Sequence, residues 1–152
     1  MGNNHPLDKR EIDRLYLAHP LAIRHDTRYS EIEFESLTEI NLINPFYDVK
    51  KEDIQQMDKG KFIPRTIKSK ITGLQIIMED LNLIDKCQGI LAIVENDKES
   101  LGTPMEVFYN SYILKRPTYV ITESCGGHPW IKGLSTKIFR NWQECIKYFQ
   151  ES

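Results

Sequence analysis

The chain has 152 residues, of which 40% are apolar and 28% charged, a composition typical of one soluble globular domain. Its formal net charge of −2 excludes an overall electrostatic attraction to nucleic acid or to an anionic membrane surface. No apolar run approaches the roughly 20 residues of a membrane span, and the polar N-terminus does not resemble a secretory signal. We therefore expect a cytoplasmic protein that binds neither membrane nor nucleic acid polymer.

Three cysteines, Cys87, Cys125 and Cys145, are spread widely along the chain. Their odd number and spacing fit neither a disulfide framework nor a zinc site, and a reducing compartment is the simplest setting. We expect no metal and no cofactor. Because no change of composition divides the sequence, we treat residues 1–152 as a single domain, with residues 1–11 as a flexible N-terminus.

Strands and helices alternate in the predicted order of elements. In chain order they are a strand at 12–18, a helix at 29–40, a short strand at 41–48, a loop with a short helix at 49–63, a long helix at 64–86, a strand at 89–94, a helix at 103–115, a strand at 117–122, a Gly-Pro loop at 124–130, a short strand at 135–139 and a helix at 141–150. The run GILAIV at 89–94 is almost entirely apolar, which indicates a strand covered on both faces.

This alternation predicts an α/β fold, a Rossmann-like or flavodoxin-like three-layer sandwich around a parallel sheet of about five strands. Ligands of such sheets bind beyond the carboxyl ends of the strands. We therefore expect the functional residues in the loops at 19–28, 45–48, 95–102 and 123–130.

The stretch SLGTPMEVFY, from residue 100, leads from one of these loops into a helix. Thr103 and Glu106 have the spacing of a capping box, with Pro104 at a favourable first helical position. The same residues also suit a ligand site, because Gly102 lets the backbone approach a ligand and Ser100 offers a hydroxyl. An ionised carboxylate at Glu106 would then be a nucleophile.

Other candidates follow the first strand and precede the third. Tyr16 is either a core residue or a site residue, and His19 is either structural or an acid–base group. Arg24 and Arg28 would bind a phosphate or carboxylate if they are not simply solvated. Asp80, on the long helix, lies at the boundary of its buried face, where a raised pKa would suit proton transfer.

The motif NPFYD places Asp48 directly after a predicted strand. Asp48 either holds ligand hydroxyls or belongs to a turn beside Pro45. In the loop at 123–130, Cys125 has no base partner that the sequence identifies. We do not assign it as a nucleophile.

Together these segments resemble the nucleoside 2-deoxyribosyltransferase superfamily over about residues 14–149. The motifs that carry the resemblance are YLAHP, DLNLI, SLGTPMEVFYNSYILKRPTYVIT and IFRNWQECIKYF. The most specific is the central block, in which Gly-x-x-x-Glu, here Gly102 to Glu106, opens a helix that a Lys-Pro type of turn follows, here Lys115 to Pro117.

The resemblance implies roles for three residues. Glu106 matches the nucleophile that forms a glycosyl-enzyme ester, Asp80 matches the acid that acts on the leaving base, and Tyr16 matches a tyrosine that orients the nucleophile. The logic is that of a retaining glycosidase with two displacements. Transferases of this superfamily pass the sugar to a second base, and hydrolases pass it to water.

Position 100 favours the hydrolase branch, the 2'-deoxynucleoside 5'-phosphate N-hydrolases. Transferases typically carry an aspartate six residues before the nucleophile, whereas the hydrolases carry a serine that holds the 5'-phosphate. This chain has Ser100, and a neutral hydroxyl tolerates a phosphate dianion that a carboxylate would repel. Arg24 or Arg28 would supply the countercharge.

The sequence also departs from the superfamily. His19 replaces a glycine, Gln88 replaces an aspartate at the start of the third strand, and neither NPFYD nor residues 49–63 resembles either branch closely. Base exchange by a deoxyribosyltransferase and a catalytically silent nucleotide-binding module therefore remain alternatives. The resemblance further implies a homodimer or larger homo-oligomer with a small nucleotide or nucleoside substrate.

Overall fold

A computed structural model of the protein describes residues 8–20, 27–45, 73–98 and 100–151. Within these residues, five parallel strands form a single sheet with the order β2-β1-β3-β4-β5. The strands are β1 (Arg14–Ala18), β2 (Asn41–Ile43), β3 (Gly89–Ile93), β4 (Thr118–Ile121) and β5 (Lys137–Phe139). The expected parallel α/β sheet is confirmed.

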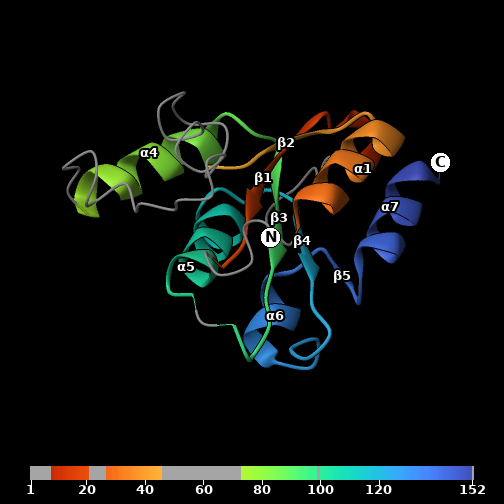
Figure 1. The fold of residues 1–152 in the computed structure, drawn as a ribbon. Helices are drawn as coiled ribbons and strands as arrows, with labels where there is room; N and C mark the ends of the chain where they lie inside the picture. Colours follow the sequence, from red (N-terminus) through yellow and green to blue (C-terminus); the bar gives the residue numbers. More distant parts are fainter. Residues whose placement is uncertain (1–7, 21–26, 46–72, 99, 152) are drawn as a thin grey trace.

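Helices cover both faces of this sheet, which gives the three-layer arrangement seen in Figure 1. One face carries α1 and α7, and the opposite face carries α4 and α5, with α6 at the lower end of the view. The helices are α1 (Arg28–Thr38), α4 (Gly73–Asp85), α5 (Gly102–Phe108), α6 (Pro129–Leu134) and α7 (Trp142–Gln150).

Alternate residues of β1 enter two separate cores, because successive side chains of a strand point to opposite faces of the sheet. Leu15 and Leu17 belong to the core beneath α1 and α7, where the Phe34 ring contacts the Phe149 ring edge-on at a centroid distance of 5.7 Å. Tyr16 belongs to the core beneath α4 and α5. All five residues of β3 are buried, as the apolar run predicts.

The structure differs most from the sequence prediction at three elements. Residues 124–130 were expected to form only a loop, but α6 begins at Pro129. The second strand ends at Ile43 rather than at residue 48. The helix that begins at Gly102 changes after Phe108 into a π-helical segment, Tyr109–Ile113, which ends two residues before the expected end.

The predicted long helix at 64–86 corresponds to α4 over residues 73–85, and its earlier part lies outside the described residues. The expected buried face is present at its C-terminal end, where Ile84 is fully buried. Leu74, Ile77 and Met78 are each more than half exposed. The 49–63 segment also lies outside the described residues.

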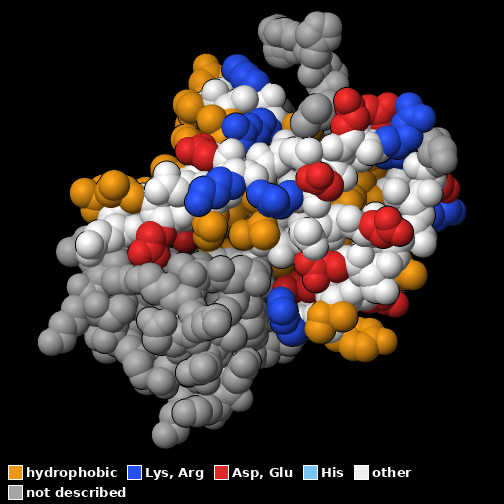
Figure 2. All heavy atoms as spheres, turned by 90° about the horizontal axis from the view of Figure 1, so that it is seen from above, with side chains coloured by type: hydrophobic (Ala, Val, Ile, Leu, Met, Phe, Trp, Pro, Cys, Tyr) orange, Lys and Arg blue, Asp and Glu red, His pale blue; other side chains and the backbone are white. Residues whose placement is uncertain are grey.

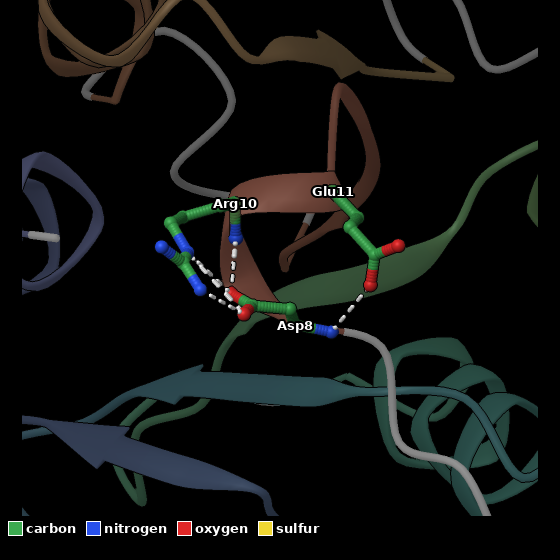
Figure 3. A network of polar contacts seen from close by, with 3 residues as sticks. All are labelled: Asp8, Arg10 and Glu11. Atoms are coloured by element: carbon green, nitrogen blue, oxygen red, sulfur yellow. Dashed lines mark hydrogen bonds and ion pairs between the residues drawn. The ribbon is translucent and has the colours of Figure 1, made fainter.

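Before β1, residues 9–11 form a short 3₁₀ helix that side chains cap at its start (Figure 3). The Asp8 carboxylate accepts from the Arg10 backbone N–H at 2.9 Å and from the Arg10 guanidinium at 2.7 Å, and the Glu11 carboxylate accepts from the Asp8 backbone N–H at 3.0 Å. The Arg10 side chain lowers the pKa of Asp8 to about 2. A hydrogen bond of 2.6 Å from Lys9 Nζ to the Tyr148 carbonyl joins this turn to α7.

At Gly89, the start of β3 lies close to the chain that enters β4. A β-carbon at this position would lie 2.5 Å from the Pro117 carbonyl oxygen. We expect Gly89→Ala to lower the free energy of unfolding by about 1–3 kcal/mol, as other overpacking substitutions do. Chemical denaturation measures the effect.

Gly133→Ala is the matched control, because a β-carbon there would meet nothing within 4 Å. It lies in α6, where alanine is favoured over glycine by about 1 kcal/mol. Equal stability of the Gly89→Ala variant and the wild type would contradict the close approach.

Candidate active site

Tyr16 and Glu106 meet at the boundary between the sheet and α5, although 90 residues separate them in sequence. The Tyr16 hydroxyl donates a hydrogen bond of 2.7 Å to Glu106 Oε2. Tyr16 is fully buried in β1, and Glu106 is half-buried on α5, the helix that follows β3. Since β1 and β3 are neighbours where the strand order reverses, the pair lies beside the topological switch point, and sheets of this order bind ligands beyond the carboxyl ends of the strands there.

The capping box expected from Thr103 and Glu106 is absent. The helix begins at Gly102, so Thr103 lies inside it and is buried. Ser100 Oγ accepts from the Thr103 backbone N–H at 3.2 Å and donates to Thr103 Oγ1 at 2.9 Å. Ser100 therefore caps the helix start, and the Glu106 carboxylate is turned toward Tyr16 instead.

Gly102 at this helix start has room around it. A β-carbon there would meet nothing within 4 Å, so packing within the described protein does not require a glycine. The role of Gly102 beside a ligand stays a prediction.

Asp80 lies on α4 and is partly buried. It precedes Ile84 by four residues and therefore shares its helix face. Ile84 is fully buried in the same core as Tyr16 and Val107 of α5. The face of α4 that carries Asp80 thus packs toward the elements that carry Tyr16 and Glu106.

Gln88, which stands where the resemblance leads us to expect an aspartate, lies at the other end of the strands. Gln88 Oε1 accepts from the Arg14 backbone N–H at 3.0 Å, and Gln88 Nε2 donates to the Glu11 carbonyl at 2.9 Å. These contacts join the beginnings of β1 and β3. Gln88 is therefore a structural residue, remote from the carboxyl ends where Ser100 lies.

His19 follows β1 and is buried with 4% exposure. Its Nδ1 lies 2.9 Å from the Pro20 carbonyl, and its Nε2 lies 3.1 Å from Asn44 Nδ2. Because a carbonyl can only accept, we assign the hydrogen to Nδ1, and Nε2 then accepts from the Asn44 amide.

Asn44 connects His19 to a buried carboxylate at Glu31, which is 1% exposed. Glu31 Oε1 accepts from Asn44 Nδ2 at 3.1 Å and from Arg28 Nη1 at 2.7 Å, while Oε2 accepts from Thr27 Oγ1 at 2.7 Å. The Arg28 guanidinium, expected to meet a ligand anion, is thus paired with Glu31. The predicted residues Arg24 and Asp48 lie outside the described residues.

Sequence reasoning missed Glu31 and Asn44. Glu31 stands among other acids in a helical pattern, so its local sequence does not distinguish it from a solvated acid. Asn44 belongs to NPFYD, in which Asp48 is the predicted site residue. The burial of both depends on the packing of α1 against the ends of β1 and β2, which no local pattern reports.

A pocket of about 280 Å³ lies at the ends of β1 and β3, beside the start of α5. Its walls include Pro20 after β1, Glu95 and Lys98 after β3, and Ser100 and Thr103 at the start of α5. The loops at the ends of β1 and β3 therefore enclose one space, as the sheet topology predicts.

The Glu95 carboxylate joins the end of β3 to the chain that leaves β4. It accepts from the backbone N–H groups of Glu123 at 2.8 Å and Ser124 at 3.1 Å, and from the Ser124 hydroxyl at 2.7 Å. Burial is the largest single influence and raises the Glu95 pKa, but hydrogen bonds from Glu123, Ser124 and Thr122 together lower it below its ordinary value. Glu95 is therefore a structural carboxylate that stays ionised.

A lowered pKa in the folded state makes ionised Glu95 stabilising above the unfolded-state pKa of about 4.3, and this stabilisation is lost as the pH falls through the folded-state pKa. We expect Glu95→Gln to lower the Tm at neutral pH, and the difference from the wild type to vanish in acid. Thermal melts over a pH series measure this. Glu123→Gln, at an exposed neighbouring carboxylate, is the control, and a pH-independent difference for Glu95→Gln would contradict the account.

A second pocket of about 480 Å³ lies between α5 and α6. Its lining is mainly apolar and includes Met105, Phe108, Trp130 and Ile131, together with Cys125 and His128. The loop at 123–130, expected among the functional loops, thus contributes to this pocket and to the Glu95 contacts.

No helix among the described residues is long and apolar enough to cross a membrane. Within the same residues, His, Cys, Asp and Glu side chains form no cluster of three or more that could hold a metal ion.

In the view of Figure 2, acidic and basic side chains intermingle over the described part of the face, without a continuous field of one sign.

Comparison with solved structures shows which fold this is. The chain is similar to a conserved protein from Enterococcus faecalis V583, with a TM-score of 0.65, 12% identity, and coverage of 91% of this chain and 98% of that one. It is also similar to a 2-deoxyribosyltransferase from Bacillus psychrosaccharolyticus, with a TM-score of 0.59, 15% identity, and coverage of 89% and 91% respectively. No protein-family model and no curated protein sequence matches the chain. The α/β fold is thus the one found in a deoxyribosyltransferase.

Proposed function

We propose that the protein cleaves the N-glycosidic bond of a nucleoside 5'-monophosphate, with a 2'-deoxynucleotide as the preferred substrate. The reaction passes through a covalent glycosyl-Glu106 intermediate and releases free base and sugar phosphate. The observation that carries the proposal is the 2.7 Å hydrogen bond from Tyr16 to Glu106 at the β1–β3 boundary. A fold shared with a 2-deoxyribosyltransferase supports it.

In the first displacement, a Glu106 carboxylate oxygen attacks C1' of the sugar. The C1'–O bond forms as the C1'–N bond breaks. The electron pair of the C1'–N bond leaves with the base, which receives a proton from Asp80. The Tyr16 hydroxyl orients the carboxylate for attack. Because Tyr16 is buried, its orientation is fixed before the substrate binds, which lowers the entropic part of the barrier.

In the second displacement, water attacks C1' and Glu106 leaves as a carboxylate. Asp80, now ionised, takes the proton from the water, so the cycle restores both carboxyl groups. Ser100, in the pocket beside α5, donates to the phosphate. His19 shapes the end of β1, and Gly102 leaves room for the sugar phosphate. Arg24 and Asp48, which lie outside the described residues, are further proposed substrate contacts. Arg28, also expected as a contact, is paired with Glu31 instead.

The alternative is transfer of the deoxyribose to a second base. The similarity to a 2-deoxyribosyltransferase favours it, and Ser100 at the position where transferases typically carry an aspartate argues against it. A silent nucleotide-binding module is the second alternative. A homodimer or larger assembly and a cytoplasmic location are also part of the proposal.

A panel of nucleoside and deoxynucleoside 5'-monophosphates, incubated with the protein and analysed by chromatography for free base, tests this function. We expect release from at least one deoxynucleotide, at a rate that an added second base does not change. Formation of a new nucleoside would show the transferase instead. If no member of the panel releases free base at high protein concentration, the proposal is wrong.

A further inference from the structure

Two charged side chains of the described residues line the pocket beside Ser100, and they differ in how many hydrogen bonds and ion pairs they already make. Those side chains are Glu95 and Lys98. The Glu95 carboxylate accepts hydrogen bonds from Thr122, Glu123 and Ser124. Lys98 Nζ has one ionic neighbour among the described residues, Asp97 Oδ2 at 3.9 Å, too long for a hydrogen bond. Among the described lining residues, Lys98 is therefore the charged group that is available to a ligand.

Hydrogen bonds also hold the backbone around Lys98 in place. Residues 95–98 form a tight turn in which the Lys98 backbone N–H donates to the Glu95 carbonyl at 3.3 Å. The Glu95 carboxylate and a 3.1 Å hydrogen bond from the Asn96 backbone N–H to Ser124 Oγ tie this turn to the chain leaving β4. Holding the backbone in this way reduces the entropy that ligand binding would cost.

Arg28, by contrast, already has a buried partner. Its guanidinium donates to Glu31 at 2.7 Å, and Glu31 is 1% exposed. Drawing Arg28 away toward a ligand would leave the buried Glu31 carboxylate without its countercharge, which is costly. The Lys98 side chain is 43% exposed and its neighbour Asp97 is 73% exposed, so little is lost when Lys98 changes partner.

From these contrasts we propose that Lys98 is a specificity-determining residue whose ammonium group pairs with the substrate's 5'-phosphate and so selects nucleotides over nucleosides. The inference rests on the proposed function for the identity of the anion. It assigns the countercharge to a residue that the sequence alone did not single out. Ser100, on the same pocket wall, donates its hydroxyl to the same phosphate.

Calorimetric titration of the full chain tests this assignment, with a nucleoside 5'-monophosphate found active in the panel, or dAMP if none is active, and the matching nucleoside. All proteins carry Glu106→Gln, so that the ligand is not consumed. We expect Lys98→Met to weaken nucleotide binding about ten- to a hundredfold, the value of a charge-assisted hydrogen bond. Nucleoside binding should not change. Lys98→Arg should restore most of the nucleotide affinity.

Lys147→Met is the matched control, because Lys147 is an exposed lysine on α7. High ionic strength should reduce the preference for nucleotide in the protein that retains Lys98 and leave Lys98→Met unaffected. An unchanged ratio of nucleotide to nucleoside affinity in Lys98→Met would overturn the assignment, as would failure of both ligands to bind.

Base release by the protein with Glu106 intact separates this inference from the proposed function. Release together with an unchanged affinity ratio in Lys98→Met means that the function holds and the Lys98 assignment fails. A reduced ratio without release from any nucleotide means that Lys98 selects the phosphate and the proposed reaction fails.

Discussion

Replacing Glu106 with glutamine is expected to reduce the rate of base release at least about a thousandfold, because an amide cannot form the glycosyl ester. The fold should be little affected, since the side chain keeps its size and can still accept a hydrogen bond from Tyr16. Single-turnover kinetics with the best substrate of the panel measure the effect. Glu33→Gln, at a partly exposed acid on α1, across the sheet from α5, serves as the control.

The companion variant Tyr16→Phe separates orientation from nucleophilic attack. It keeps the buried ring and removes the 2.7 Å hydrogen bond to Glu106. We expect a smaller loss of about ten- to a hundredfold in kcat, the value of one hydrogen bond to a charged group. Base release by Glu106→Gln at the wild-type rate would exclude Glu106 as the nucleophile, whatever Tyr16→Phe does.

Glu31→Ala is expected to lower the free energy of unfolding by about 3 kcal/mol, the lower end of the range for breaking a buried ion pair. The substitution removes the acceptor of Thr27, Arg28 and Asn44 together. The lower end applies because Arg28 is 38% exposed and can regain water. Urea denaturation at neutral pH measures the change.

Glu33→Ala is the matched control, because it makes the same replacement on the same helix at a partly exposed position outside the buried network. It should stay within about 0.5 kcal/mol of the wild type, as substitutions away from such networks usually do. Glu31→Gln should be intermediate, since the amide keeps one acceptor but turns an NH₂ group toward the donors. If Glu31→Ala were as stable as Glu33→Ala, the buried network would not contribute to stability.

The sheet could be predicted from sequence because its signals are local. The continuous apolar run at 89–94 and the helical patterns on either side fix a parallel α/β fold before any contact is known. The sequence did not predict α6, because a segment of six residues that begins with Pro129 and contains Gly133 is too short to show a helical period. The π-helical segment was missed because hydrogen bonds between residues five apart, such as that from the Leu114 N–H to the Tyr109 carbonyl, leave no local signal in the sequence.

The candidate site, too, could be predicted from sequence only in part. The family resemblance that singled out Glu106 and Tyr16 led to two residues that the structure brings within a hydrogen bond, whereas their chemical roles remain predictions. The spacing of Thr103 and Glu106 suggested a capping box, because spacing cannot tell at which residue a helix begins. The burial of Glu31 and the place of Lys98 in the pocket wall depend on contacts between loops distant in sequence, which one sequence does not reveal.

The covalent intermediate on Glu106 is the central claim, and mass spectrometry of the acid-quenched protein tests it most directly. The protein is mixed with its best nucleotide substrate, quenched during turnover, digested and analysed. The account predicts that the peptide containing Glu106 gains the mass of one sugar phosphate, and that Glu106→Gln shows no such gain. Base release with no adduct on the Glu106 peptide, or with an adduct on another residue, would contradict the account.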